Sequence, residues 1–588
     1  MSRFPSFRNV LNSTAKTILR FPLEIIISIV GTVFAIIFNE IKYSSPNREF
    51  YEKAIMSCSL CLVLFLSVSL YFMASRRNTI LRYATSIGLG SLIALFIFSF
   101  HKNFTNVEIL QFLVLNIALH LLVSFAGFLP RTYNQNEFWE FNKQLFLRIL
   151  TSILYSVVLY CGLALAILAI DQLFKVEFYD HIYLHTFLVI AGIFNTIFFL
   201  SGVPETNNSE NPLVLNYPKG LKNFTQYVLL PLISLYLVIL ICYEVKILIT
   251  LSLPVGWVSY LVLVFAIFGI LSFLLVHPIA TETNNLWMRT FNRWFYFLLI
   301  PLLGLLFWAI LYRVNLYGFT HERYYVLLLS IWLSIVVAYF LIQKNPKIKF
   351  IPISLCIGGL FSILGPQSAD SISKNSQLSR FESYMQPSAN KKLNFGQQKD
   401  LSSIVSFLEE NYGAAIMVPY AKTKLEALLK RNKTPNEFAI MEALGYEYKS
   451  RYSRYQDSDT EIYYAYYEND ESVEIIHGYD LSFRISSNTE FECTECAKIE
   501  NKNYSIKSGK KNYGIELQIN EDIIPLKTID FIHNNSAFGL GPNNEKVTQL
   551  VETSQYKILI TYLNVNGYIE KGKKTIDNYQ LKIMVDIK

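Results

Sequence analysis

The stretch LYGFTHERYYVLLLSIWL, from Leu316 to Leu333, places a short polar turn between two long apolar runs. Gly318 can adopt the left-handed conformation that ends a helix, and Thr320 can cap the helix that follows. Each flanking run is long enough to cross about 30 Å of hydrocarbon as a helix. The stretch therefore predicts a helical hairpin that returns the chain into a membrane.

Similar apolar runs recur through the first 365 residues, and 52% of the whole chain is hydrophobic. They predict about eleven transmembrane helices, at residues 21–40, 54–74, 83–100, 107–128, 148–170, 182–203, 226–250, 257–278, 294–313, 324–342 and 350–365. The last of these segments is the shortest. The first carries Glu24 and lacks a small-residue cleavage site, so we expect it to be an uncleaved anchor.

Lysine and arginine are concentrated in the N-terminal segment and in every second loop, which predicts that these parts face the cytoplasm. The basic positions include Arg3, Arg8, Arg76, Arg77, Arg131, Lys219, Lys222, Arg289, Arg293, Lys344 and Lys347. An odd number of crossings then places everything after Gly365 outside the cytoplasm. These loops and a lysine-rich C-terminal part account for the net charge of +7. We therefore expect the lipid bilayer, and no nucleic acid, as a partner.

The sequence becomes polar and amphipathic after residue 365, which divides the chain into a transmembrane helical domain at 1–365 and a soluble α+β extracytoplasmic part. Residues 366–445 are expected to be helical: Leu401, Ile404, Val405 and Leu408 recur at helical spacing, and Thr434 is expected to cap a later helix. Residues 446–588 alternate β-branched or aromatic residues with polar ones, which predicts a mainly antiparallel β domain.

Two of the seven cysteines, Cys493 and Cys496, form the sequence ECTEC in this β-rich part. A structural zinc site would need a second such pair, so a local disulfide is favoured in an oxidising compartment. Two free thiols are the second alternative. A metal-binding or redox-active role is the third.

Two motifs resemble bacterial multi-pass inner-membrane proteins of the uncharacterised "domain of unknown function 4153" type. Those proteins carry a Tyr-Gly-x-Thr-x-x-Arg-Tyr-Tyr hairpin before the final spans and a Gly-Pro-x-Ser-Ala stretch with Ser-Gln and Arg after them. The matching residues are Tyr317, Gly318, Thr320, Arg323, Tyr324, Tyr325, Gly365, Pro366, Ser368, Ser376, Gln377 and Arg380. The resemblance implies a bacterial inner (cytoplasmic) membrane protein with a periplasmic C-terminal domain, and it implies no activity.

The hairpin motif has two interpretations. In the first, the motif only ends one helix, begins the next and anchors them at the depth of the lipid headgroups, through Tyr317, Thr320, Arg323 and Tyr324. His321, Glu322 and Arg323 also lie together on the first turn of a span, where a partly buried cation needs a partner. Arg323 would then dock the outer segment containing Ser376, Gln377 and Arg380, with Glu382 as a candidate partner, or bind an anionic lipid headgroup.

Polar residues elsewhere give weaker candidates. His181 and His185 lie one helical turn apart beside Asp180 and Glu177, which resembles a metal-binding arrangement without matching a known hydrolase motif. Within the predicted spans, Asn116, His120, Asn195 and Glu244 must face the bundle or a watery cavity. Helix-to-helix hydrogen bonding is the simpler explanation for these four residues.

These observations favour a non-enzymatic membrane protein, without a cofactor, whose envelope-facing domain binds a partner protein or a small ligand. The alternative is a transporter or lipid-handling protein with a path past Asn116, His120 and Asn195. An enzyme would rest only on Asp180, His181 and His185, with no recognisable catalytic constellation elsewhere in the sequence.

Overall fold

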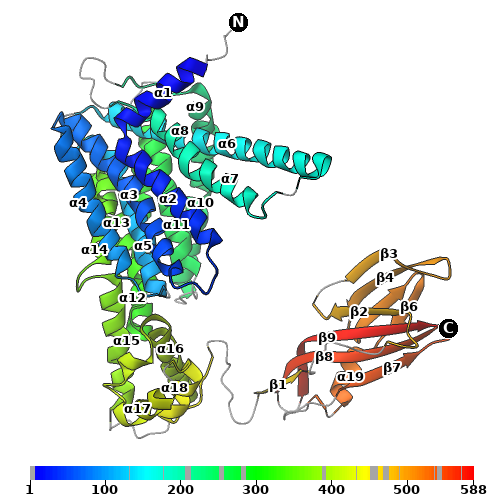
Figure 1. Cartoon of the computed structure of the whole chain (residues 1–588). Coiled ribbons are helices and arrows are strands. Elements are labelled where there is room, and N and C mark those ends of the chain that lie inside the picture. The colour runs from blue at the N-terminus through cyan, green and yellow to red at the C-terminus, as the bar shows by residue number, and fades with distance from the viewer. Residues whose placement is uncertain are drawn as a thin grey trace. The chain divides into compact units, whose positions relative to one another are not determined.

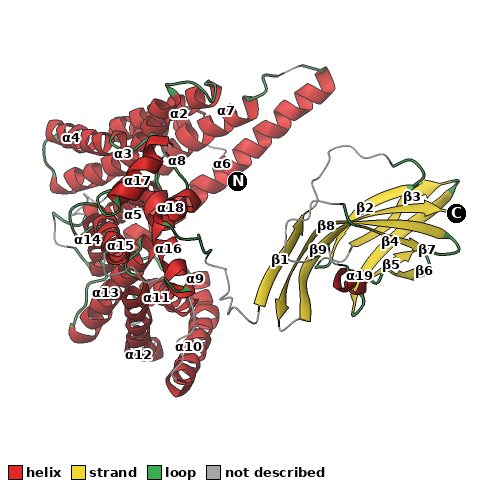
Figure 2. Cartoon of the chain, turned by 90° about the horizontal axis from the view of Figure 1, so that it is seen from below, coloured by secondary structure: helices red, strands yellow, loops and turns green. Residues whose placement is uncertain are grey.

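The computed structural model divides the chain into two compact units, Met1–Lys392 with Asp400–Tyr448, and Leu393–Lys399 with Lys449–Lys588. It describes residues 7–102, 104–130, 133–176, 178–205, 213–250, 257–279, 286–386, 393–431, 434–450, 461–467, 476–488, 491–535, 537–538, 546–570 and 573–588. Figure 2 shows that helices make up the first unit, whereas strands with one short helix make up the second.

The first unit begins with helices that contain the predicted spans (Figure 1). They are α1 (Phe7–Arg20), α2 (Pro22–Glu40), α3 (Arg48–Ser75), α4 (Thr79–Phe98), α5 (Asn106–Ala126), α6 (Gln135–Phe174), α7 (Ile182–Val189), η1 (Ile190–Phe194), α8 (Asn195–Ser201), α9 (Lys219–Phe224), η2 (Thr225–Leu229), α10 (Leu230–Thr250), α11 (Trp257–Val276), α12 (Leu286–Tyr317), α13 (His321–Ile342) and α14 (Phe350–Ile363).

Among the described residues, nine helical segments are long and apolar enough to cross a membrane. Two shorter apolar helices, Leu261–Val276 and Phe350–Ile363, coincide with two further predicted spans. The prediction of a multi-pass helical membrane protein is thus confirmed, while the count of eleven spans stays a prediction.

The membrane helices pack into two groups. One apolar core joins α10, α11, α12 and α13, and others join α2, α3, α5 and α14 with the first part of α6. Figure 1 shows α6 and α7 extending sideways from the upright helices α3, α4 and α5. Beyond Ser156, α6 has no buried residue, and its large apolar side chains, such as Leu165 and Leu173, are exposed. Apolar helices with so much exposed surface fit a lipid environment.

Shorter helices complete the first unit: α15 (Ala369–Met385), the part of α16 (Phe395–Tyr412) from Asp400 onward, η5 (Ala414–Met417), α17 (Lys422–Arg431) and α18 (Glu437–Leu444). The predicted apolar face of α16 is fully buried through Leu401, Ile404, Val405 and Leu408. The predicted cap of α18 was wrong by two residues. Asn436, not Thr434, is the N-cap, because its side chain accepts from the backbone N–H of Ala439.

The second unit contains two antiparallel sheets and the short helix α19 (Thr528–Asn534). The first sheet has β1 (Glu461–Tyr467), β8 (Tyr556–Glu570), β9 (Lys573–Ile587) and β2 (Leu481–Ser486) in that order, with β7 (Thr548–Glu552) also paired to β8. The second sheet has β3 (Phe491–Ile499), β4 (Lys502–Lys511), β5 (Gly514–Ile519) and β6 (Asp522–Pro525) in order.

One apolar core is shared by both sheets, which makes the second unit a β-sandwich. Alternate residues of β8, Ile558, Ile560 and Tyr562, are fully buried in it. Residues of β4 and β5, such as Ile506 and Leu517, fill the same core from the other sheet. The predicted antiparallel β structure of the C-terminal part is therefore confirmed.

Candidate functional site

The C-terminal end of α12 is held by side chains from α13 and α15. The carbonyl of Tyr317 accepts hydrogen bonds from Arg323 Nη1 at 3.0 Å, from Gln377 Nε2 at 3.0 Å and from Arg380 Nη1 at 2.6 Å. The last carbonyls of a helix have no partner within the helix and carry partial negative charge. Two guanidinium groups and an amide supply donors to this end.

Gly318 allows the chain to turn at this point. Its φ is +67°, in the region that favours glycine, and a Cβ here would lie 2.8 Å from both Arg380 Cδ and Ser376 Oγ. The next residue, Phe319, donates its N–H to Ser376 Oγ at 2.9 Å and accepts from Gln377 Nε2 at 2.7 Å. The turn and α15 therefore fit together closely, and we call this set of contacts the hairpin clamp.

An ion pair between Arg380 and Asp400 extends the hairpin clamp to α16. Arg380 Nη2 lies 2.6 Å from each carboxylate oxygen of Asp400, and Tyr384 donates to the same carboxylate at 2.8 Å. Burial, together with the bond to the Asp400 carboxylate, raises the pKa of Tyr384, so it stays a donor at neutral pH. Arg380 thus holds the end of α12 through Nη1, while its Nη2 bonds both to Asp400 of α16 and to the Leu316 carbonyl of α12 at 3.3 Å.

A second set of contacts joins the start of α13 to α15 and α16. Tyr412 donates to Asp370 Oδ1 at 2.8 Å, and His321 Nε2 lies 3.9 Å from the same oxygen. Burial alone would raise the pKa of Asp370, but the hydrogen bond from Tyr412 and the nearby His321 ring outweigh it and hold that pKa below its usual value. The His321 ring also stacks on Phe407, with ring centroids 5.3 Å apart.

Sequence reasoning identified most, but not all, of these residues. The structure brings Tyr317, Arg323, Ser376, Gln377 and Arg380 together, and Tyr324 donates to the Gln367 carbonyl nearby at 2.7 Å. Thr320 occupies the N-cap position of α13 without a side-chain cap bond, and Glu322 is exposed.

The expected partner of Arg323 needs correction. Arg323 Nη1 donates to the carbonyls of Tyr317 and Gly318, whereas Glu382 is exposed and makes no ion pair with it among the described residues. Asp370, Asp400 and Tyr412 were missed altogether. They lie 16 or more residues from their partners in sequence, and no local pattern marks them.

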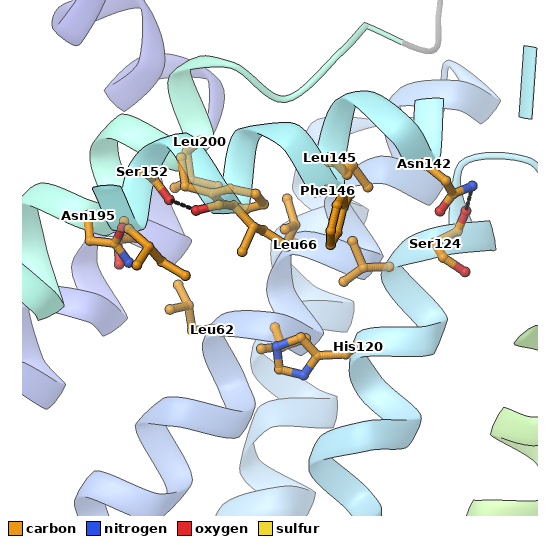
Figure 3. Close-up of a pocket in the computed structure, with 16 residues that line it drawn as sticks. Leu62, Leu66, His120, Ser124, Asn142, Leu145, Phe146, Ser152, Asn195 and Leu200 are labelled. Carbon is orange, nitrogen blue, oxygen red and sulfur yellow. Dashed lines mark hydrogen bonds between the residues drawn. The ribbon is translucent and has the colours of Figure 1, made fainter. Parts of the chain in front are cut away.

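A cavity of about 420 Å³ lies among α3, α5, α6 and α8 (Figure 3). Its walls are mostly apolar, and its polar lining residues are His120, Ser124, Asn142, Ser152, Asn195 and Thr196. His120, Phe146 and Ile153 are exposed, so the cavity opens sideways from the bundle. Two of the predicted intramembrane polar residues, His120 and Asn195, therefore border the same space.

The other two predicted residues lie elsewhere. Asn116 does not line the cavity, although its carbonyl lies 2.9 Å from His120 Nδ1. Glu244 is buried on α10. Asn195 follows the π-helical turn η1, a distortion found often at functional sites. Its Oδ1 accepts from Ser156 Oγ at 3.3 Å, and it also borders a second cavity of about 160 Å³ along α6.

A buried polar cluster joins α2, α3 and α4, and the sequence did not indicate that its two charged residues pair. Glu24 is fully buried and lies 3.5 Å from Arg82 Nη2, and Ser69 bonds to both side chains. Arg82 also donates to the Arg20 carbonyl at 2.9 Å. Paired burial explains how α2 can carry a carboxylate within a predicted span.

The predicted histidine pair lies beside Glu40 at the end of α2. Glu40 Oε1 lies 3.3 Å from His181 Nδ1 and 2.8 Å from His185 Nε2, and Tyr179 donates to the same carboxylate. Asp180 is not part of this contact set, and Glu177 lies outside the described residues. In the described part of the chain, no group of three or more His, Cys, Asp or Glu residues is arranged to hold a metal ion.

Cys493 is the last paired residue of β3 before a bulge, Cys496 lies within the bulge, and both are free thiols. Cys496 Sγ donates to the carbonyls of Cys493 at 3.4 Å and Tyr504 at 3.6 Å. Their pairing under oxidising conditions stays a prediction.

Together, these features define a polytopic α-helical membrane protein with a C-terminal β-sandwich. The family model described as Domain of unknown function (DUF4153) matches residues 54–402, which is more than half of the chain. The protein belongs to this family, as the two motifs predicted.

A curated relative is the Uncharacterized protein PM1469 of Pasteurella multocida (strain Pm70). The two chains are 25% identical over 272 residues, a match that spans 45% of each chain. No solved structure matches the chain.

Proposed function

We propose that this protein handles lipid, and that the cavity among α3, α5, α6 and α8 binds the acyl chain of a membrane lipid without catalysing a reaction. The observation that carries the proposal is the cavity itself. Its volume of about 420 Å³ is within the usual range for ligand pockets, and its walls are apolar with a few polar groups. From the sequence, binding by an envelope-facing domain was the first hypothesis and lipid handling was the alternative. Because of the cavity, we place lipid handling first.

Lipid is the occupant that the surroundings favour. The cavity lies between helices long and apolar enough to cross a membrane, and it opens beside exposed apolar side chains of α6. His120 and Asn195 offer hydrogen bonds to ester or hydroxyl oxygens, which an acyl chain alone does not need. A lipid that places its acyl chain against the apolar walls and such an oxygen near His120 would match both the apolar and the polar lining residues.

The same proposal includes a location. The distribution of lysine and arginine and the bacterial relative support an inner membrane with the N-terminus in the cytoplasm and the C-terminal unit in the periplasm. The eleven helical segments would then supply an odd number of crossings.

The test is to fill the cavity. Ser152 is buried and lines it, whereas its neighbour Thr151 is exposed and does not. We expect Ser152→Leu to lower the lipid retained by the purified protein, measured by mass spectrometry after mild detergent extraction. Thr151→Leu is the matched control and should retain the parental amount. Equal retention in all three proteins would refute the proposal.

Binding of a partner by the C-terminal unit is the second candidate. A polar hollow of about 230 Å³ lies at the ends of β2 and β4, lined by Ser486, Ser487, Asn488, Ser508 and Lys510 among others. A photo-crosslinker at residue 488 of the full chain should yield a defined adduct, and one at the exposed Glu552 should not. The absence of an adduct specific to residue 488 would rule out this candidate.

A further inference from the structure

Three arginines gather at the outer end of α12. Arg323 and Arg380 donate to the same carbonyl, that of Tyr317, at 3.0 and 2.6 Å, so their guanidinium groups are neighbours. Arg313 lies one helical turn before Tyr317 on α12, and its charge acts on Arg323. Like charges this close repel one another unless anions lie among them.

The protein supplies a counter-ion to only one member of this group within the described residues. Asp400 binds Arg380 through both oxygens. No carboxylate of the described residues lies within 4.0 Å of Arg313 or Arg323, and the charge of the exposed Glu322 acts on Arg323 more weakly than the charges of Arg380 and Arg313 do. Arg323 uses Nη1 for the carbonyls of Tyr317 and Gly318, which leaves its Nε and Nη2 without a protein acceptor in this part of the chain.

The surroundings of these two arginines match the depth of lipid headgroups. The flanking side chains Leu311, Tyr312 and Leu316 on α12 are large, apolar and exposed. The Arg323 guanidinium lies 5.4 Å from the centroid of the Tyr317 ring, and that ring is half exposed. Tyrosine and arginine at the end of an apolar helix are typical of the membrane interface.

We propose that Arg313 and Arg323 bind the phosphate of an anionic phospholipid at the outer end of the α12–α13 hairpin. A phosphate accepts paired hydrogen bonds from guanidinium nitrogens, which the free Nε and Nη2 of Arg323 can donate. Its negative charge offsets the repulsion among the three arginines. This site is separate from the cavity and does not depend on its occupant.

The probe is phosphatidylglycerol, titrated into the delipidated full-length protein in mild detergent and followed by native mass spectrometry. Removing charge-assisted hydrogen bonds should weaken binding about tenfold. We expect this for Arg313→Gln and Arg323→Gln. Arg323→Lys should weaken binding similarly because it keeps the charge but loses the fork. The control is Arg77→Gln, at an exposed position beyond α3, and it should bind like the parent.

Arg313→Gln is the variant least expected to misfold. Arg313 has no hydrogen-bond partner among the described residues, so its replacement does not break a contact of the hairpin clamp. Parental affinity in Arg313→Gln and Arg323→Lys would overturn the proposal. If inorganic phosphate bound as tightly as phosphatidylglycerol and displaced it, the site would be assigned to free phosphate and the lipid assignment would be overturned. Retained lipid binding in Ser152→Leu, with loss in Arg313→Gln, would separate this site from the cavity.

Discussion

Arg380 connects three helices through one side chain. Its two terminal nitrogens reach the Tyr317 carbonyl on α12 and the Asp400 carboxylate on α16, while its backbone belongs to α15. A planar fork can make both contacts at once, which a lysine ammonium on a flexible stem does less well. The sequence assigned the docking role to Arg323, and the structure shows Arg380 in that role.

We therefore predict that Arg380→Lys loosens α16. The lost bonds to a charged partner correspond to about 1.5–3 kcal/mol, so the amides of α16 should exchange with deuterium roughly ten times faster or more. Hydrogen–deuterium exchange with mass spectrometry measures this in the intact protein. Arg323→Lys is the contrasting variant, and α16 should exchange in it at the parental rate. Unchanged α16 exchange in Arg380→Lys would contradict the role assigned to this side chain.

Asp370 gives the same region a dependence on pH. Its pKa in the folded protein lies below its usual value of 3.8, because the nearby His321 ring and the hydrogen bond from Tyr412 favour the carboxylate. A carboxylate with a depressed pKa contributes stability above its unfolded pKa, and that contribution is lost as pH falls through the folded pKa. The contribution should thus be complete above about pH 5 and should decline below it.

Asp370→Asn should remove this pH-dependent part. We expect the melting temperature of the parent to fall more steeply than that of the variant between about pH 5 and about pH 3, measured in detergent by differential scanning fluorimetry. A parental slope in Asp370→Asn would identify another group as the source of the acid sensitivity.

The α12–α13 hairpin is an element whose local parts could be predicted, whereas its partners could not. Gly318, the end of α12 and the start of α13 follow from local residue preferences and apolar length, whereas α12 begins at Leu286, before the predicted span 294–313. The apolar face of α16 also follows from periodicity. Asp400 and Glu40 were missed because their roles depend on how distant helices pack, and one sequence contains no local signal for that.

Gly318→Ala tests the geometry of this turn. A Cβ at φ +67° is strained, and it would clash with Arg380 Cδ and Ser376 Oγ at 2.8 Å. We expect a loss of roughly 1–3 kcal/mol in the free energy of unfolding, seen as a lower melting temperature. Gly304→Ala is the control, because a Cβ at this α12 position meets no atom within 4 Å. Equal melting temperatures for both variants would show that the turn tolerates a side chain.

At the scale of the whole molecule, the class of protein was predictable because apolar length is a strong signal, and the count of spans is the part that needs an experiment. α14 contains 14 residues, which span only about 21 Å as a helix. It packs against α5, where Gly359 approaches Val114 and Ala118. A helix this short needs neighbours or a thinned bilayer to complete a crossing.

The proposed topology predicts that a reporter active only outside the cytoplasm works when fused after Lys588 and fails when fused after Arg77. A fusion after Lys344 serves as a second cytoplasmic reference and should also fail. An inactive reporter after Lys588, in a protein of normal abundance, would mean an even number of crossings, and α14 would be the first helix to reconsider.

The hairpin clamp also determines how force would pass between α15 and the membrane. The covalent path from α15 runs through the short segment 364–368 into α14. A parallel path runs through Gln377 and Arg380 into the end of α12, and a third runs through Asp370 and Gln367 to α13. A pull on α15 would therefore be shared by α12, α13 and α14. The covalent segment 364–368 would not carry the load alone.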